Sequence, residues 1–119
     1  MTRRDECVLL WDIVTHSEAA AAFLGRLSEE EYAADPMRQS AVERQLIVVG
    51  EAYGTLDRCD PVLAERLPGD TRAVVGMRNL LVHGYEWIQP QTVHRVVTED
   101  LPLLIEAARR LLEELDSSR

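Results

Sequence analysis

The chain has 119 residues, 46% apolar and 29% charged, a balance that fits one folded domain with a hydrophobic core and a solvated surface. Its formal net charge of −8 excludes nucleic-acid binding through a broad basic surface. The sequence has no run of about 18 apolar residues, so we expect no membrane span and a cytoplasmic location. Residues 71–98 carry three arginines and one glutamate, a net charge of +2, and are the segment best suited to contact phosphate.

Helical periodicity runs through most of the sequence, and sustained strand-like alternation does not occur in it. The first predicted helix spans about residues 5–27. Its apolar positions, at spacings of three and four, are Val8, Trp11 (or Asp12), Val14, Thr15, Ala19, Ala22, Phe23 and Leu27. Ser28 and Glu31 have the spacing of a capping box, with Ser28 as the N-cap, and begin a short helix. That helix should end near Asp35-Pro36, because proline disfavours a helical conformation at the preceding residue.

A second long helix is predicted over about residues 37–56. Its apolar positions are Ala41, Val42, Gln45-Leu46, Val49, Ala52, Tyr53 and Leu56. Asp60-Pro61 then starts a short helical turn over residues 62–67, which Pro68-Gly69 ends.

The next helix begins at an N-cap, either Asp70 or Thr71, and extends to His83, where Gly84 is a natural residue to end it. This helix has two unlike faces. The face expected to pack on the core holds Ala73, Val74, Met77, Leu80 and Leu81. The opposite face mixes small apolar with polar residues: Val75, Gly76, Arg78, Asn79, Val82 and His83.

The last predicted helix spans about residues 90–116. Pro102 lies inside it and predicts a kink or break near Glu99-Asp100, with Asp100 a possible new N-cap. Together these elements predict an all-α antiparallel bundle of four long and two short helices, forming a single domain over residues 1–119.

The mixed face of the predicted helix over 71–83 is unusual for a surface in contact with water. A purely solvated face would carry glutamate and lysine, whereas Val75, Gly76 and Val82 favour packing against another helix, with Gly76 permitting close approach. We interpret this face as the interface of a homodimer. A twofold axis there would bring Arg78 and His83 of both copies into one cleft.

Arginine and histidine together suit reactions at phosphate. The guanidinium of Arg78 offers a rigid fork of donors for phosphate oxygens, and the imidazole of His83 can accept or donate a proton near neutral pH. RNA carries its own nucleophile, the 2′-hydroxyl, so such a site needs no metal ion, and the sequence has no carboxylate cluster with metal-ligand spacing. On spacing alone, the same pair also fits an interfacial salt bridge and a histidine at a helix end.

Residues 77–85, Met-Arg-Asn-Leu-Leu-Val-His-Gly-Tyr, closely resemble the HEPN motif, in which an arginine is followed after four residues by a histidine. The resemblance is strongest to the HepT-like branch, whose motif extends to a tyrosine two residues after the histidine, here Tyr85. Residues 45–52 resemble the second long helix of that family, and residues 99–102 resemble the start of its last helix.

The resemblance implies a homodimeric toxin of a type II toxin–antitoxin system, acting as a metal-independent endoribonuclease without a cofactor. Arg78 and His83 would be the catalytic pair, with Asn79 a supporting polar residue beside the scissile phosphate. The implied partner is an MntA-like minimal nucleotidyltransferase antitoxin, which would transfer AMP to Tyr85. The added phosphate and adenosine would fill the cleft and repel RNA.

Other interpretations of the same residues stay open at this point. HEPN domains also serve as non-catalytic companions, or nucleotide-binding subunits, of minimal nucleotidyltransferases, and the acidic net charge favours that role slightly. The chain could also be a helical adaptor in which the Arg78 and His83 spacing is a coincidence. Tyr85, in turn, could be a loop aromatic that packs on Trp87.

Overall fold

The structure is a computed structural model that describes residues 1–68, 71–83 and 88–117, with the backbone alone described at 71–73, 80 and 83. Its elements in chain order are α1 (Arg3–Leu24), α2 (Glu29–Ala33), α3 (Pro36–Cys59), α4 (Pro61–Ala64), α5 (Thr71–His83), α6 (Pro90–Arg95), the π-helix η2 (Val96–Asp100) and α7 (Leu101–Ser117). The last three are contiguous and form one rod. Over the described residues the fold is therefore four long and two short helices, as predicted.

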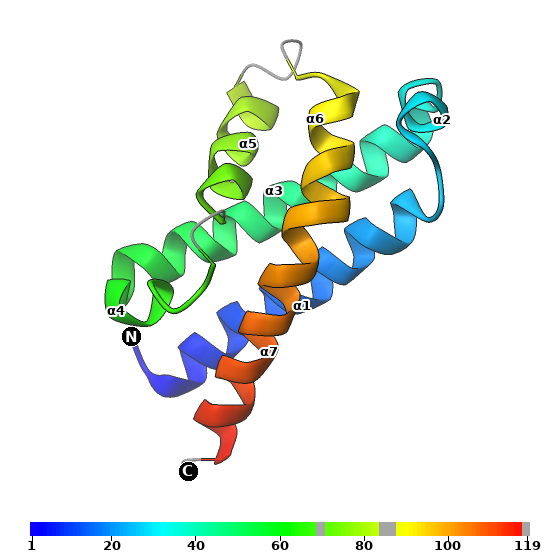
Figure 1. Cartoon of the computed structure of the whole chain (residues 1–119). Helices are drawn as coiled ribbons and strands as arrows, with labels where there is room; N and C mark the ends of the chain where they lie inside the picture. The colour runs from blue at the N-terminus through cyan, green and yellow to red at the C-terminus, as the bar shows by residue number, and fades with distance from the viewer. Residues whose placement is uncertain (69–70, 84–87, 118–119) are drawn as a thin grey trace.

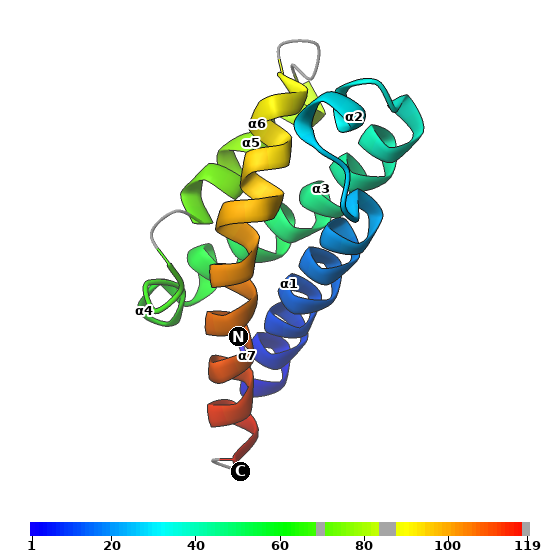
Figure 2. The same ribbon diagram turned by 45° about the vertical axis from the view of Figure 1, so that its right-hand side comes forward.

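The long helices alternate in direction along the chain (Figure 1). α1 and α3 pack side by side, α5 packs against α3, and α7 packs against α1. The rod from α6 to α7 crosses the bundle, so that α6 lies beside α2 at one end and α7 passes α1 toward the other (Figure 2). The predicted all-α antiparallel bundle is confirmed, and α5 is left with one face turned away from the other helices.

Side-chain caps set most of the helix starts. Thr2 and Asp5 form a capping box at α1, which was not among the predicted caps. The predicted box at α2 is confirmed: the Glu31 N–H donates to Ser28 Oγ (3.1 Å) and the Ser28 N–H donates to Glu31 Oε1 (3.0 Å). These hydrogen bonds with Ser28 lower the pKa of the Glu31 carboxyl. Asp35 is the N-cap of α3, where the Arg38 N–H donates to Asp35 Oδ1 (3.0 Å), so this helix begins at Pro36.

The first helix ends three residues earlier than the predicted position of about residue 27. Gly25 has a φ of 60°, in the left-handed region that glycine adopts without steric cost, and its N–H donates to the Ala21 carbonyl. α3, by contrast, extends to Cys59, past the predicted end at Leu56. There Asp60 takes over as the N-cap of α4, where the Leu63 N–H donates to Asp60 Oδ1 (3.1 Å).

Pro102 changes the last helix in a different way from the predicted kink and new N-cap. The chain stays helical, and the π-helix η2 widens it just before the proline, with the Leu101 N–H donating to the Val96 carbonyl, five residues earlier. Proline has no N–H to donate and its ring clashes with the carbonyl four residues before it, so a wider turn relieves both problems. Asp100 lies inside η2 and does not begin a separate helix.

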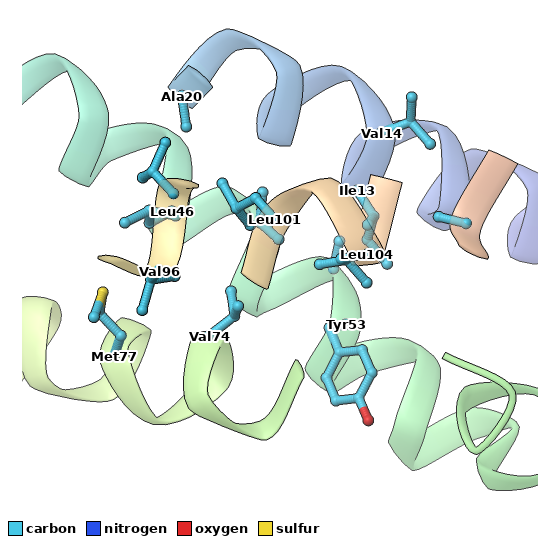
Figure 3. Packing of buried hydrophobic residues seen from close by; sticks show 14 of the residues in the cluster. Ile13, Val14, Ala20, Leu46, Tyr53, Val74, Met77, Val96, Leu101 and Leu104 are labelled. Carbon is cyan, nitrogen blue, oxygen red and sulfur yellow. The ribbon is translucent and has the colours of Figure 1, made fainter. Parts of the chain in front are cut away.

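The core is formed by aliphatic side chains from all four long helices. Ile13 of α1, Leu46 of α3, Val74 of α5 and Leu101 of α7 gather in its centre and are 0–1% exposed (Figure 3). The predicted apolar face of α3 is largely confirmed. Its buried residues are Val42, Leu46, Val49, Gly50, Ala52, Tyr53 and Leu56.

The predicted apolar face of α1 is mostly wrong. Val8, Trp11 and Phe23 are 53%, 55% and 42% exposed. The residues of α1 that pack into the bundle are Leu10, Ile13, Val14, Ser17, Ala20 and Leu24. Apolar residues surround most of this helix, so their spacing did not identify the face that packs against α3 and α7.

α1 is long and apolar enough, with a mean hydropathy of 1.3 over 18 residues, to pass a test for a membrane span based on length and composition alone. Helices at the core of soluble proteins pass the same test. Leu10, Ile13 and Ala20 are fully buried against the other helices, as in such a core. One side of α1 therefore belongs to the core of the bundle.

Candidate active site

α5 presents the two faces that the sequence predicts. Val74, Met77 and Leu81 are buried in the core, while Asn79 and Val82 are exposed on the other side. The side chains at 73, 80 and 83, which belong to the same prediction, lie outside the described residues. One side of α5 thus anchors the helix to α3, and the other side is open.

The crossing of α5 over α3 occurs at Gly50, which is buried. A Cβ atom at this position would lie 2.4 Å from Cβ and 2.9 Å from Cγ of Arg78, closer than side-chain atoms can approach. The missing side chain lets the two helices approach closely, so the base of the Arg78 side chain is fixed against the backbone of α3.

Two polar neighbours hold the guanidinium of Arg78. Its Nη2 donates to Glu51 Oε1 (3.1 Å) on α3, and its Nη1 donates to Asn79 Oδ1 (2.9 Å) on α5. Its Nε is buried without a hydrogen-bond partner, while the side chain as a whole is 27% exposed. The group is therefore oriented from two sides and still has N–H donors available for an incoming oxyanion.

A pocket of about 380 Å³ lies between α3 and α5 at this point. Its volume is in the usual range for small-ligand sites. The residues that line it are Gly50, Glu51, Gly54, Thr55, Arg58, Val75, Arg78 and Asn79. The structure thus brings Arg78 and Asn79 together in one hollow, as the prediction requires of a phosphate site.

The two other predicted site residues are not placed with the same detail. His83 is the last residue of α5, and only its backbone is described. Tyr85 lies outside the described residues. Within residues 1–68, 71–83 and 88–117, no three His, Cys, Asp or Glu side chains are grouped in a way that could hold a metal ion.

The contribution of α3 to this site was not predicted from the sequence. Glu51, Thr55 and Arg58 line the pocket, yet none belongs to the motif on α5. One signal for the contact was present: Gly50 and Gly54 are one helical turn apart, a spacing of small residues that allows another helix to approach closely. The spacing did not indicate which arginines and carboxylates of α3 face α5, because this depends on the angle and position at which the two helices cross.

Comparison with known proteins places the chain among ribonucleases. A family model described as "Ribonuclease HepT-like" matches residues 13–111. "Putative RNase MJ1380" from Methanocaldococcus jannaschii is 29% identical over 103 residues, covering 86% of this chain and 92% of that protein. "Probable ribonuclease HepT" from Thermococcus cleftensis is 30% identical over 95 residues, covering 80% of this chain and 84% of that protein. No solved structure was found to match.

The resemblance of residues 77–85 to the HepT-like motif is thus supported by a match that extends over most of the chain. Fold and family agree, since the match includes all of α3, all of α5 and most of α7. The chain belongs to the HepT-like ribonuclease family of the HEPN superfamily.

Proposed function

We propose that this protein is the toxin of a type II toxin–antitoxin pair and cleaves RNA without a metal ion, using Arg78 and His83 in a cleft shared by two copies. The observation that carries the proposal is the guanidinium of Arg78, which Glu51 and Asn79 orient at the wall of a pocket while donors remain free. Membership of a ribonuclease family supports RNA as the substrate.

The proposed reaction uses the 2′-hydroxyl of RNA as nucleophile. His83 takes its proton, the 2′-oxygen forms a bond to phosphorus, and the bond from phosphorus to the 5′-oxygen breaks. An imidazolium, from His83 of either copy, gives a proton to the departing 5′-oxygen. Arg78 donates hydrogen bonds to the non-bridging oxygens, whose negative charge grows in the transition state, and Asn79 keeps the guanidinium in place.

The open face of α5 supports the proposed homodimer. Val82 is 42% exposed there, and a Cβ atom added to Gly76 would meet no atom within 4 Å, so a second helix could approach closely. Val75 and Asn79 border the same face. A second copy on this surface would cover the exposed valine and bring two sets of Arg78 and His83 together.

Replacing His83 by alanine should abolish RNA cleavage and toxicity while the dimer persists, because it removes the group that transfers the proton. Cleavage of a fluorescent RNA, with dimerisation followed by light scattering, measures both effects. His16→Gln is the matched control: this histidine contacts Gln45 between α1 and α3 and should be dispensable. Equal cleavage by wild type and His83→Ala would disprove the ribonuclease mechanism, and EDTA should leave the wild-type rate unchanged.

We further propose that the protein is cytoplasmic, and that an MntA-like nucleotidyltransferase neutralises it by transferring AMP to Tyr85. The support is the position of Tyr85 two residues after His83 and the family to which the chain belongs. Co-expression with the nucleotidyltransferase should raise the intact mass by one or more AMP units, and Tyr85→Phe should remove the increase. An unchanged mass, or an adduct that persists in Tyr85→Phe, would contradict this assignment.

A second candidate function is a non-catalytic companion, or nucleotide-binding subunit, of a minimal nucleotidyltransferase. The net charge of −8 favours it, because an acidic protein repels RNA except at a local basic site. The two functions give opposite results in the same experiment: a companion would co-purify with the enzyme and cleave no RNA at any concentration.

A further inference from the structure

The pocket beside Arg78 contains a second guanidinium, that of Arg58. Its Nη2 donates to Thr55 Oγ1 (3.2 Å), one turn earlier on α3. Its Nη1 lies 3.6 Å from the point that a Cβ atom of Gly54 would occupy. The side chain thus folds back along α3 toward the crossing with α5, and its charge lies in the pocket.

The charge of Arg58 is less compensated than that of Arg78. Arg78 forms a salt bridge with Glu51, whereas in the described part of the chain Arg58 has no carboxylate within salt-bridge distance. Its neighbour Thr55 is neutral and leaves the guanidinium its full positive charge. In a chain with a net charge of −8, this pocket is therefore a local site of positive charge with two guanidinium groups.

Each of the two arginines lies beside a glycine of α3. Cβ and Cγ of Arg78 pack on Gly50, and Nη1 of Arg58 lies beside Gly54, while both side chains line the same pocket. With no side chain at Gly54, which is partly exposed, a bound strand can approach the backbone of α3 there. Two guanidinium groups in one pocket suit two successive phosphates of one strand better than a single phosphate.

We propose that Arg58, together with the hydroxyl of Thr55, binds the phosphate next to the one that is cleaved. This inference rests on the proposed function, because Arg78 defines the scissile position. Arg58 is then a positioning residue: it holds the strand in register and does not contact the reacting atoms. The preferred substrate is a single-stranded RNA with at least one phosphate beside the scissile bond, rather than a dinucleotide.

The test compares wild type and R58Q on two substrates: a single-stranded RNA of about ten nucleotides, and a dinucleoside monophosphate, which has only the scissile phosphate. On the longer RNA, R58Q should raise KM about tenfold while kcat changes by less than twofold. The preference for the longer RNA, as a ratio of kcat/KM values, should fall about tenfold. R58K should recover part of the loss, because it keeps the charge.

Salt dependence gives a second measurement, which does not require cleavage. Wild type and R58Q are titrated with a 2′-O-methyl RNA that cannot be cleaved, at several salt concentrations. The slope of log K against log salt should be smaller by about 0.7 in R58Q, as expected for the loss of one phosphate contact to a single strand. R110Q is the control: it removes the same charge from an exposed position on α7, where Arg110 pairs with Glu106, and should keep the wild-type slope.

The outcomes separate this inference from the proposed function. If wild type cleaves RNA, but R58Q matches it in KM, in substrate preference and in slope, Arg58 does not bind the neighbouring phosphate and the ribonuclease assignment stands. If no RNA is cleaved but the slope still falls in R58Q alone, Arg58 contacts a phosphate of bound RNA, and both the ribonuclease assignment and the placing of that phosphate beside a scissile bond fail. Equal slopes for wild type, R58Q and R110Q without cleavage would overturn both.

Discussion

Substituting lysine for Arg78 should lower kcat/KM for RNA cleavage by about 100-fold or more, although the positive charge is kept. Lysine cannot reproduce the planar fork that donates to Glu51 and Asn79 while it presents further N–H groups to a phosphate. Loss of one well-placed donor to a developing oxyanion typically costs 10²–10³ in rate. Initial rates on a fluorescent RNA, at saturating and subsaturating concentrations, measure the loss.

The matched control for this substitution is Arg110→Lys. Arg110 forms an exposed salt bridge with Glu106 within α7, and such a pair contributes about 0–1 kcal/mol to stability. This variant should retain both its stability and its rate. If Arg78→Lys cleaved RNA as fast as Arg110→Lys does, the hydrogen-bonding geometry at Arg78 would have no part in catalysis, and the proposed site would be wrong.

Replacing Gly50 by alanine should destabilise the protein by roughly 1–3 kcal/mol, the usual cost of inserting an atom into well-packed structure. The new Cβ would lie 2.4 Å from Cβ of Arg78 and 3.4 Å from the Val74 carbonyl oxygen. Because these atoms belong to α5 itself or to the base of a side chain, α5 has to move away from α3. We expect a drop in Tm of several degrees in calorimetry, together with reduced cleavage as Arg78 is displaced.

Gly54→Ala, in the same helix, provides the control for this effect. Its Cβ would make only an ordinary contact, 3.6 Å from Arg58 Nη1, so the better helix propensity of alanine should dominate. Stability should rise by up to about 1 kcal/mol. The two glycines are thus expected to respond with opposite signs. A rise in Tm for both variants would show that the α3–α5 crossing is looser than the contact at Gly50 implies.

The sequence was sufficient to predict the parts of the fold that depend on neighbouring residues. Ser28 and Glu31 form the predicted capping box because both partners lie within one helical turn. The predicted helix before Gly84 is likewise present over Thr71–His83, while its predicted end at Gly84 lies outside the described residues. The buried face of α1 was not predictable in this way, since the choice between Trp11 and Leu10 as core residues depends on where α3 and α7 lie.

In the candidate site, too, the residues close together in sequence were predicted and those brought together by helix packing were not. The motif on α5 identified Arg78 and Asn79, and these two residues are in contact at the pocket. Glu51 and Arg58 could not be assigned from sequence, because they share a pocket with Arg78 only through the crossing of two helices at Gly50. The glycine spacing on α3 indicated that a close crossing could occur, but it did not reveal which polar groups the crossing would bring together.

The π-helix before Pro102 allows one rod to serve two neighbours that lie in different directions. Before it, His94 of α6 faces α2, where its ring centroid lies 6.3 Å from that of Tyr32 and its Nε2 lies 2.8 Å from the Leu27 carbonyl oxygen. After it, Leu101 and Leu104 point into the core. The wide turn accommodates one residue more than an α-helical turn, equivalent to about 100° of rotation. If the rod were a regular α-helix with one residue fewer, α7 would be rotated and the face that packs on α1 would turn toward water. The wide turn therefore lets α6 face α2 while α7 faces α1.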